Sequence, residues 1–176
     1  NKAKNHNLNE EDANLIIEKL KVRPSLLVKL AEHFNCKTIA EVGTAQGLQS
    51  ISFAKCINKS KVYTCDIVDH RDKSFEVNNN LFFVKGNSKD LSQKIKNDKE
   101  KIDMFWIDGA HDHYSVVFDF INLIKHSSQN SIWVFDDFDS RFGCFYDINI
   151  IKNYFDNNIV IELGKTASGN PNRILI

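Results

Sequence analysis

The residues best suited to chemistry in this sequence of 176 residues are polar side chains that follow, or lie within, short apolar runs. Runs of this kind are typical of buried strands in a parallel sheet, and the carboxyl ends of such strands meet at one edge. Carboxylates gathered there repel one another unless a cation or a hydrogen-bonding ligand compensates. The pattern therefore predicts a ligand site along that edge, at Glu41, Asp66, Asn87, Asp108 and Asp136.

Three carboxylates are expected to meet at one part of this edge. Asp108 follows the apolar run Ile102–Ile107, and Asp136 and Asp137 follow the run Ile132–Phe135. Three carboxylates suffice to hold a hard cation with oxygen ligands, and such a cation would bind a substrate hydroxyl and stabilise its deprotonated oxygen. The alternative is that Asp136 and Asp137 only cap a helix.

A candidate general base lies just beyond Asp108. His111 is three residues further along the chain, and imidazole titrates in the range needed to take a proton from a hydroxyl group. Asp112 and His113 are less favoured alternatives for the same role.

A glycine-containing loop lies in the stretch Thr38–Ser50, after its apolar start and before a helical pattern. Gly43 allows a ligand to approach the backbone closely, and Gly47 allows tight packing where the helix starts. Asp66 follows Gly43 at the interval at which a doubly wound fold places an acid beside a ribose. A third glycine is absent, however, and Glu41 disfavours a pyrophosphate. An adenosyl ligand that carries an ammonium group fits this loop better than a dinucleotide.

The motif E-V-G-T-A-Q-G, from Glu41 to Gly47, resembles the first motif of class I S-adenosylmethionine-dependent methyltransferases, in the form used by the catechol O-methyltransferase-like branch. The stretch I-D-G-A-H-D-H-Y is also similar to a bacterial branch with antibiotic-sugar O-methyltransferases, although Ala110 stands where an acid is common there. The resemblance implies S-adenosylmethionine-binding residues at Glu41, Gly43, Thr44, Ala45, Gly47, Asp66, Ile67, Asn87, Ser88 and Asp108.

The resemblance also implies a reaction. Asp108, Asp136 and Asp137 match the family's magnesium ligands, and His111 stands where the family carries a lysine or histidine base. We therefore expect metal-assisted O-methylation of a small-molecule hydroxyl. Two alternatives remain open: a metal-independent methyltransferase that uses His111 alone, and a non-catalytic scaffold that binds an adenosyl ligand.

The elements that position these residues alternate between strands and helices. Strands are predicted at Lys61–Cys65, Leu81–Val84, Ile102–Ile107 and Ile132–Phe135, with a helix over Tyr114–Lys125. A helix at Ile148–Phe155 is followed by strands at Ile159–Leu163 and Arg173–Ile176. The expected fold is α/β, a doubly wound, mostly parallel seven-stranded sheet of the Rossmann-like methyltransferase type with a C-terminal antiparallel hairpin.

Length and composition indicate one domain over residues 1–176, with N-terminal helices in 1–37 and a Rossmann-like core in 38–176. Two helices are expected before the first strand, the second beginning at Pro24.

Lys plus Arg and Asp plus Glu number 23 each, so no overall charge attracts nucleic acid or an anionic membrane. The four cysteines lack metal-binding spacing and suggest reduced thiols in the cytoplasm. The family resemblance makes a homodimer an open expectation.

Overall fold

The computed structural model describes residues 10–71, 73–165 and 171–176, and its centre is one seven-stranded sheet in the order β3-β2-β1-β4-β5-β7-β6. The first five strands of that order run parallel, and β7 pairs antiparallel with both β5 and β6. This confirms the predicted α/β fold class and its C-terminal hairpin. The strands are β1 Thr38–Val42, β2 Lys61–Asp66, β3 Leu81–Lys85, β4 Ile102–Ile107, β5 Ser127–Phe135, β6 Val160–Lys165 and β7 Pro171–Leu175.

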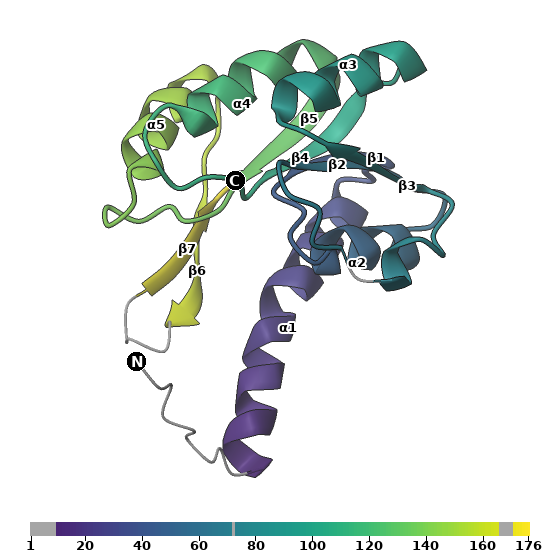
Figure 1. Ribbon diagram of the computed structural model, residues 1–176. Coiled ribbons are helices and arrows are strands. Elements are labelled where there is room, and N and C mark those ends of the chain that lie inside the picture. Colours follow the sequence, from purple (N-terminus) through teal and green to yellow (C-terminus); the bar gives the residue numbers. More distant parts are fainter. Residues whose placement is uncertain (1–9, 72, 166–170) are drawn as a thin grey trace.

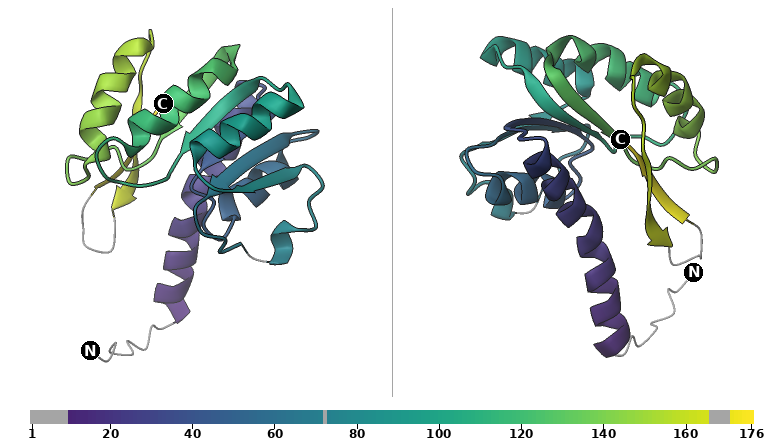
Figure 2. Two further views of the ribbon diagram at one scale, coloured as in Figure 1. Left: turned by 45° about the horizontal axis from the view of Figure 1, so that its top comes forward. Right: turned by 180° about the vertical axis from the view of Figure 1, so that it is seen from behind.

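Helices cover both faces of the sheet (Figure 1). The helices α3 Ser88–Asp98, α4 Ser115–Leu123 and α5 Cys144–Ile151 lie on one face, and α1 Glu10–His33 and α2 Leu48–Cys56 lie on the other. Figure 2 shows the same two layers with the top of the molecule tilted forward and from behind. Short 3-10 turns occur at Lys73–Phe75, Ile124–His126 and Lys152–Tyr154.

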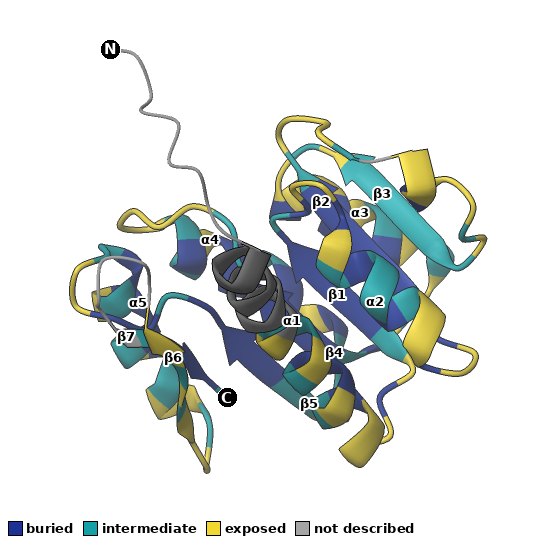
Figure 3. Cartoon of the chain, turned by 90° about the horizontal axis from the view of Figure 1, so that it is seen from below, coloured by how far each residue is buried: buried dark blue, intermediate teal, exposed yellow. Residues whose placement is uncertain are grey.

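The hydrophobic core is divided between these two faces because side chains alternate along each strand. On β4, Phe105 and Ile107 pack into the cluster beneath α3, α4 and α5, whereas Met104 and Trp106 pack into the cluster beneath α1 and α2. All four side chains are buried. Figure 3 shows the central strands as the most buried part of the chain, so the sheet forms a rigid platform for the loops at its carboxyl edge.

The N-terminal segment forms one helix, which corrects the prediction of two. The helix α1 runs from Glu10 to His33 with Pro24 inside it. A proline inside a helix removes one backbone hydrogen bond and its ring pushes against the carbonyl group four residues earlier; this can kink a helix without ending it. Leu27 and Ala31 are fully buried against the sheet. The N-terminal part of α1 extends away from the sheet (Figure 1).

The buried face of α4 also differs from the predicted one. The predicted face contained Val117, Phe120, Ile121 and Ile124, but the structure buries Val116, Phe120 and Leu123 and leaves Ile121 64% exposed. Apolar residues on both flanks of the helix make two helical faces equally plausible from sequence. Part of the connection between the two predicted C-terminal strands, residues 166–170, lies outside the described residues. Within the described part of the chain, no helix combines the length and apolar character needed to cross a bilayer.

Candidate active site at the carboxyl edge of the sheet

The loop after β1 folds tightly against its neighbours because it contains glycines in left-handed conformations. Gly43 has φ of +94°, and a Cβ atom placed there would lie 1.8 Å from the backbone oxygen of Asp108. Gly47, with φ of +87°, lies just before α2, where a Cβ atom would come within 2.6 Å of the Phe75 ring. Two loops therefore approach one another more closely than any side chain would allow.

Glu41 lies behind this loop and is buried among hydroxyl groups. It is 1% exposed, and its carboxylate accepts hydrogen bonds from Ser50 Oγ and, at 2.5 Å, from Thr64 Oγ1. Thr44 Oγ1 is 2.6 Å from the same Thr64 hydroxyl. Burial raises the pKa of Glu41 to about 7, against the effect of the two hydroxyl donors. The network ties the loop to β2 and α2.

Asp66, at the end of β2, holds the loop from its other side. One of its carboxylate oxygens accepts the Ala45 N–H at 2.9 Å, and the other accepts the Val68 N–H at 3.2 Å. Each carboxylate oxygen has a further lone pair. Asp66 can therefore hold the loop and still accept hydrogen bonds from a ligand.

A cavity of about 750 Å³ opens beside this loop. Its size suits a small organic molecule. The predicted ligand residues that line it are Gly43, Ala45, Asp66, Ile67, Asn87, Ser88 and Asp108. The other three, Glu41, Thr44 and Gly47, are not among its lining residues; they support the loop from behind, through the Glu41 network and the Phe75 contact.

The cavity has a second wall that sequence reasoning missed. Tyr114, Phe118 and Asp119 line it from the start of α4. Burial raises the pKa of Asp119 to about 6, and the neighbouring Ser88 hydroxyl partly offsets that rise. The sequence did contain a signal for Asp119 as a site residue, because it is an acid on an otherwise apolar helix and buried carboxylates are rare. Tyr114 and Phe118 were hidden within a helical pattern that suggested only core packing.

The acids that follow β4 and β5 meet an arginine from α1. The Arg23 guanidinium lies 2.5 Å from Asp136 Oδ2 and 3.7 Å from Asp108 Oδ2. Burial and the neighbouring Asp136 carboxyl raise the pKa of Asp108, whereas Arg23 opposes this shift. Burial likewise raises the pKa of Asp136, and Arg23 again opposes it. The predicted crowding of acids is therefore present, and part of its charge is balanced from within the chain.

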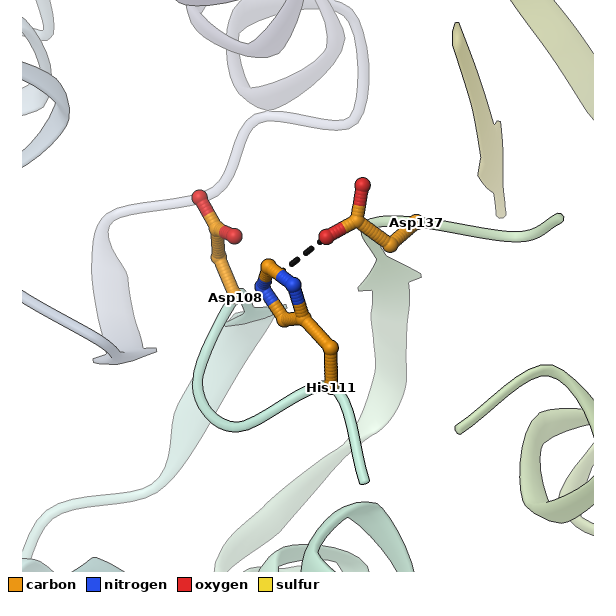
Figure 4. Close-up of side chains that lie close together, drawn as sticks. All are labelled: Asp108, His111 and Asp137. Atoms are coloured by element: carbon orange, nitrogen blue, oxygen red, sulfur yellow. Dashed lines mark ion pairs between the residues drawn. The ribbon is translucent and has the colours of Figure 1, made fainter. Parts of the chain in front are cut away.

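Asp137 points to His111 instead (Figure 4). His111 Nε2 lies 2.9 Å from Asp137 Oδ2, and Phe142 packs edge-on against the imidazole with 5.3 Å between ring centroids. Asp137 itself has φ of +49°, a left-handed conformation that is uncommon outside glycine and frequent at functional sites. The structure therefore builds an imidazole–carboxylate pair at the edge of the sheet.

The two alternative bases, Asp112 and His113, have different surroundings. His113 faces α5, where its Nδ1 is 4.0 Å from Asp147 Oδ1, and Asp112 is exposed. The Tyr114 N–H donates to Asp147 at 2.5 Å, so α5 anchors the loop that carries His111.

The side chains that lie close enough together to hold a metal ion are not the same three that the sequence predicted. One potential ligand atom each from Asp108, His111 and Asp137 lies within 4.8 Å of the others. Two carboxylates and an imidazole suit a divalent cation. Asp136, the third predicted ligand, directs one oxygen at Arg23 instead.

Comparison with known proteins gives a consistent assignment. A family model described as a methyltransferase domain matches residues 40–138. The O-methyltransferase from Bacillus cereus in complex with SAH is similar in structure, with a TM-score of 0.69 and 18% identity over 87% of this chain and 78% of that one. A comparison with curated proteins gives no match.

Two further solved structures have the same fold. TomG, the O-methyltransferase from Streptomyces achromogenes involved in tomaymycin synthesis, was solved with SAM; its TM-score is 0.67 at 18% identity, covering 87% of this chain and 78% of that one. Cofactor-bound Rv0187 from MTB gives a TM-score of 0.71 at 14% identity, covering 97% of both chains. At these identities the likeness establishes the fold, and it confirms the Rossmann-like architecture predicted from sequence.

Proposed function

Because the chain belongs to the methyltransferase domain family, we propose that it transfers the methyl group of S-adenosylmethionine to a hydroxyl group of a small molecule. Family and fold confirm the predicted class I methyltransferase, while the acceptor and the role of a metal belong to the proposal. The observation that carries it is the His111–Asp137 pair at 2.9 Å, beside the Asp108 that lines the cavity. The homodimer and the cytoplasmic location stay predictions.

The residues that line the cavity suit S-adenosylmethionine by their chemistry. The lone pairs that remain on Asp66 can accept the ribose hydroxyls, and Ile67, which is 72% exposed, offers an apolar surface to the adenine ring. Asn87 and Ser88 begin α3 beside that surface. The close approach of Gly43 to Asp108 leaves backbone rather than side chains facing the amino acid portion.

Proton removal from the acceptor is assigned to His111. S-adenosylmethionine supplies an electrophilic methyl group, so the acceptor oxygen must lose its proton as it attacks. When the Nε2–H of His111 donates to Asp137, the ring presents Nδ1 as its basic nitrogen. Asp137 then fixes the tautomer and stabilises the imidazolium that forms. Asp137 is thus a positioning residue, and His111 is the catalytic residue.

A metal-assisted form of this reaction is the second candidate, favoured by the cluster of Asp108, His111 and Asp137. A bound divalent cation would act as a Lewis acid on the acceptor oxygen. The nitrogen of His111 that faces Asp137 cannot both ligate that cation and donate to the carboxylate. The metal-independent form therefore needs a hydrogen on that nitrogen, whereas a cation bound to it needs its lone pair.

The test combines ligand binding with turnover. Calorimetric titration with S-adenosylmethionine measures cofactor binding, and formation of S-adenosylhomocysteine with a panel of catechols and sugar hydroxyls measures transfer. We expect binding, and turnover that His111→Gln lowers but His113→Gln does not. Turnover that survives chelation favours His111 as the base, and turnover that requires Mg²⁺ favours the metal-assisted form. Binding without turnover on any hydroxyl acceptor would refute O-methylation and favour the scaffold alternative.

A further inference from the structure

Arg23 belongs to the first helix of the chain, but its guanidinium lies beside Asp108 and Asp136 at the carboxyl edge of the sheet, here called the acidic edge. Its guanidinium pairs with Asp136 at 2.5 Å and lies 3.7 Å from Asp108. A second guanidinium nitrogen donates to Asn172 Oδ1 on β7 at 3.2 Å, and the group lies over the Trp106 ring at 6.0 Å. Arg23 thus joins α1 to the ends of β4 and β5 and to the hairpin.

Asp136 depends on this contact because it is buried. The residue is 4% exposed, and its Oδ1 finds no hydrogen-bond partner within the described part of the chain. A nearby positive charge stabilises the ionised form of a buried carboxyl group whose hydrogen-bonding capacity is only half satisfied. Arg23 supplies that charge through Oδ2, and Oδ1 keeps its capacity to accept a donor or a cation.

We propose that Arg23 is a built-in cation of the acidic edge, and that it competes with divalent metal ions for Asp108 and Asp136. A guanidinium delivers positive charge and hydrogen bonds to carboxylates without any bound ion. A divalent cation that used both Asp108 and Asp136 would have to displace it and break its contact with Asn172. While Arg23 holds Asp136 and only approaches Asp108, the side chains that remain close enough together for a metal are Asp108, His111 and Asp137.

The proposal concerns the site of the proposed methyl transfer but is tested without turnover. Titration of the full chain with Mn²⁺, followed by calorimetry and by the electron paramagnetic resonance of free Mn²⁺, gives the affinity directly. Arg23→Gln removes the competing charge, so we expect it to bind Mn²⁺ at least about tenfold more tightly than the unmodified chain. Arg23→Lys keeps the charge and should stay close to the unmodified chain.

Two further variants separate this effect from general changes in charge or folding. Arg173→Gln removes an arginine that pairs with Glu162 on the hairpin, and we expect no change in Mn²⁺ affinity. Arg23→Gln combined with Asp136→Asn removes both partners, and we expect the gained affinity to be lost.

The proposal is overturned if Arg23→Gln binds Mn²⁺ no better than the unmodified chain, or if Arg173→Gln gains as much affinity. It is also overturned if the gain survives in the double variant, because Asp136 would then not be a ligand. Mn²⁺ should raise the melting temperature of Arg23→Gln more than that of the unmodified chain. An equal rise in both would also count against the proposal. None of these results depends on whether methyl transfer is found.

Discussion

Replacement of Gly43 by alanine tests whether the loop after β1 forms the cofactor site. The new Cβ atom would lie 1.8 Å from the Asp108 oxygen and 2.6 Å from its carbonyl carbon, so the two loops must separate. The left-handed backbone, with φ of +94°, adds strain of about 1–2 kcal/mol. Forced separation of packed backbone adds about 1–3 kcal/mol. Since Gly43 and Asp108 both line the cavity, we expect S-adenosylmethionine affinity to fall at least about tenfold.

Gly164→Ala is the matched control. Gly164 also has a left-handed backbone, with φ of +115°, but a Cβ atom there meets nothing within 4 Å. Both variants carry the backbone strain, and only Gly43→Ala carries the collision. Thermal unfolding should place Gly43→Ala below Gly164→Ala by roughly 2–12 °C, and calorimetry should find unchanged cofactor affinity in Gly164→Ala. Equal melting temperatures and equal affinities in the two variants would refute the loop assignment.

Three other changes have defined outcomes. The pKa of Glu41 is raised from 4.5 to about 7, so between these pH values the native state keeps a proton on Glu41 that the unfolded state has lost. The native state therefore loses about 3 kcal/mol of stability as pH rises from about 4.5 to 7. Urea unfolding should find this decline missing in Glu41→Gln. Asp66→Asn should weaken S-adenosylmethionine binding about 10- to 100-fold in calorimetry, whereas Asp69→Asn, at an exposed acid, should not. Asp137→Asn should lower turnover at least about tenfold with cofactor affinity unchanged; equal turnover would remove Asp137 from the mechanism.

The sheet and the composition of its edge were predictable because they depend on local patterns. Continuous apolar runs identified the strands, and parallel strands bring their carboxyl ends together whatever the helices do. That rule alone placed Asp66, Asn87 and Asp108 at one cavity, as the structure has them. The loop glycines were predictable as positions that need a left-handed backbone, but the space beside Gly43 is taken by the Asp108 backbone rather than by the predicted ligand.

Arg23 was not predictable, because its role depends on how α1 is placed relative to strands far along the chain. The expectation of a helix starting at Pro24 left Arg23 in a connection between two helices. The continuous helix instead holds the guanidinium over the ends of β4 and β5. A sequence pattern records which residues share a helical face, but it contains no information on where that helix lies on the sheet.

The arrangement at the edge changes the meaning of the clustered acids. Crowded carboxylates alone suggest a need for an external cation, yet most of these acids have partners within the chain. Hydroxyl groups bind Glu41, backbone N–H groups bind Asp66, Arg23 pairs with Asp136, and His111 pairs with Asp137. The fold can therefore gather these acids before any ligand binds. A metal ion at this edge would replace existing pairings rather than neutralise unpaired carboxylates. Its affinity is therefore set by the difference in free energy between its own contacts with the acids and the pairings that it replaces.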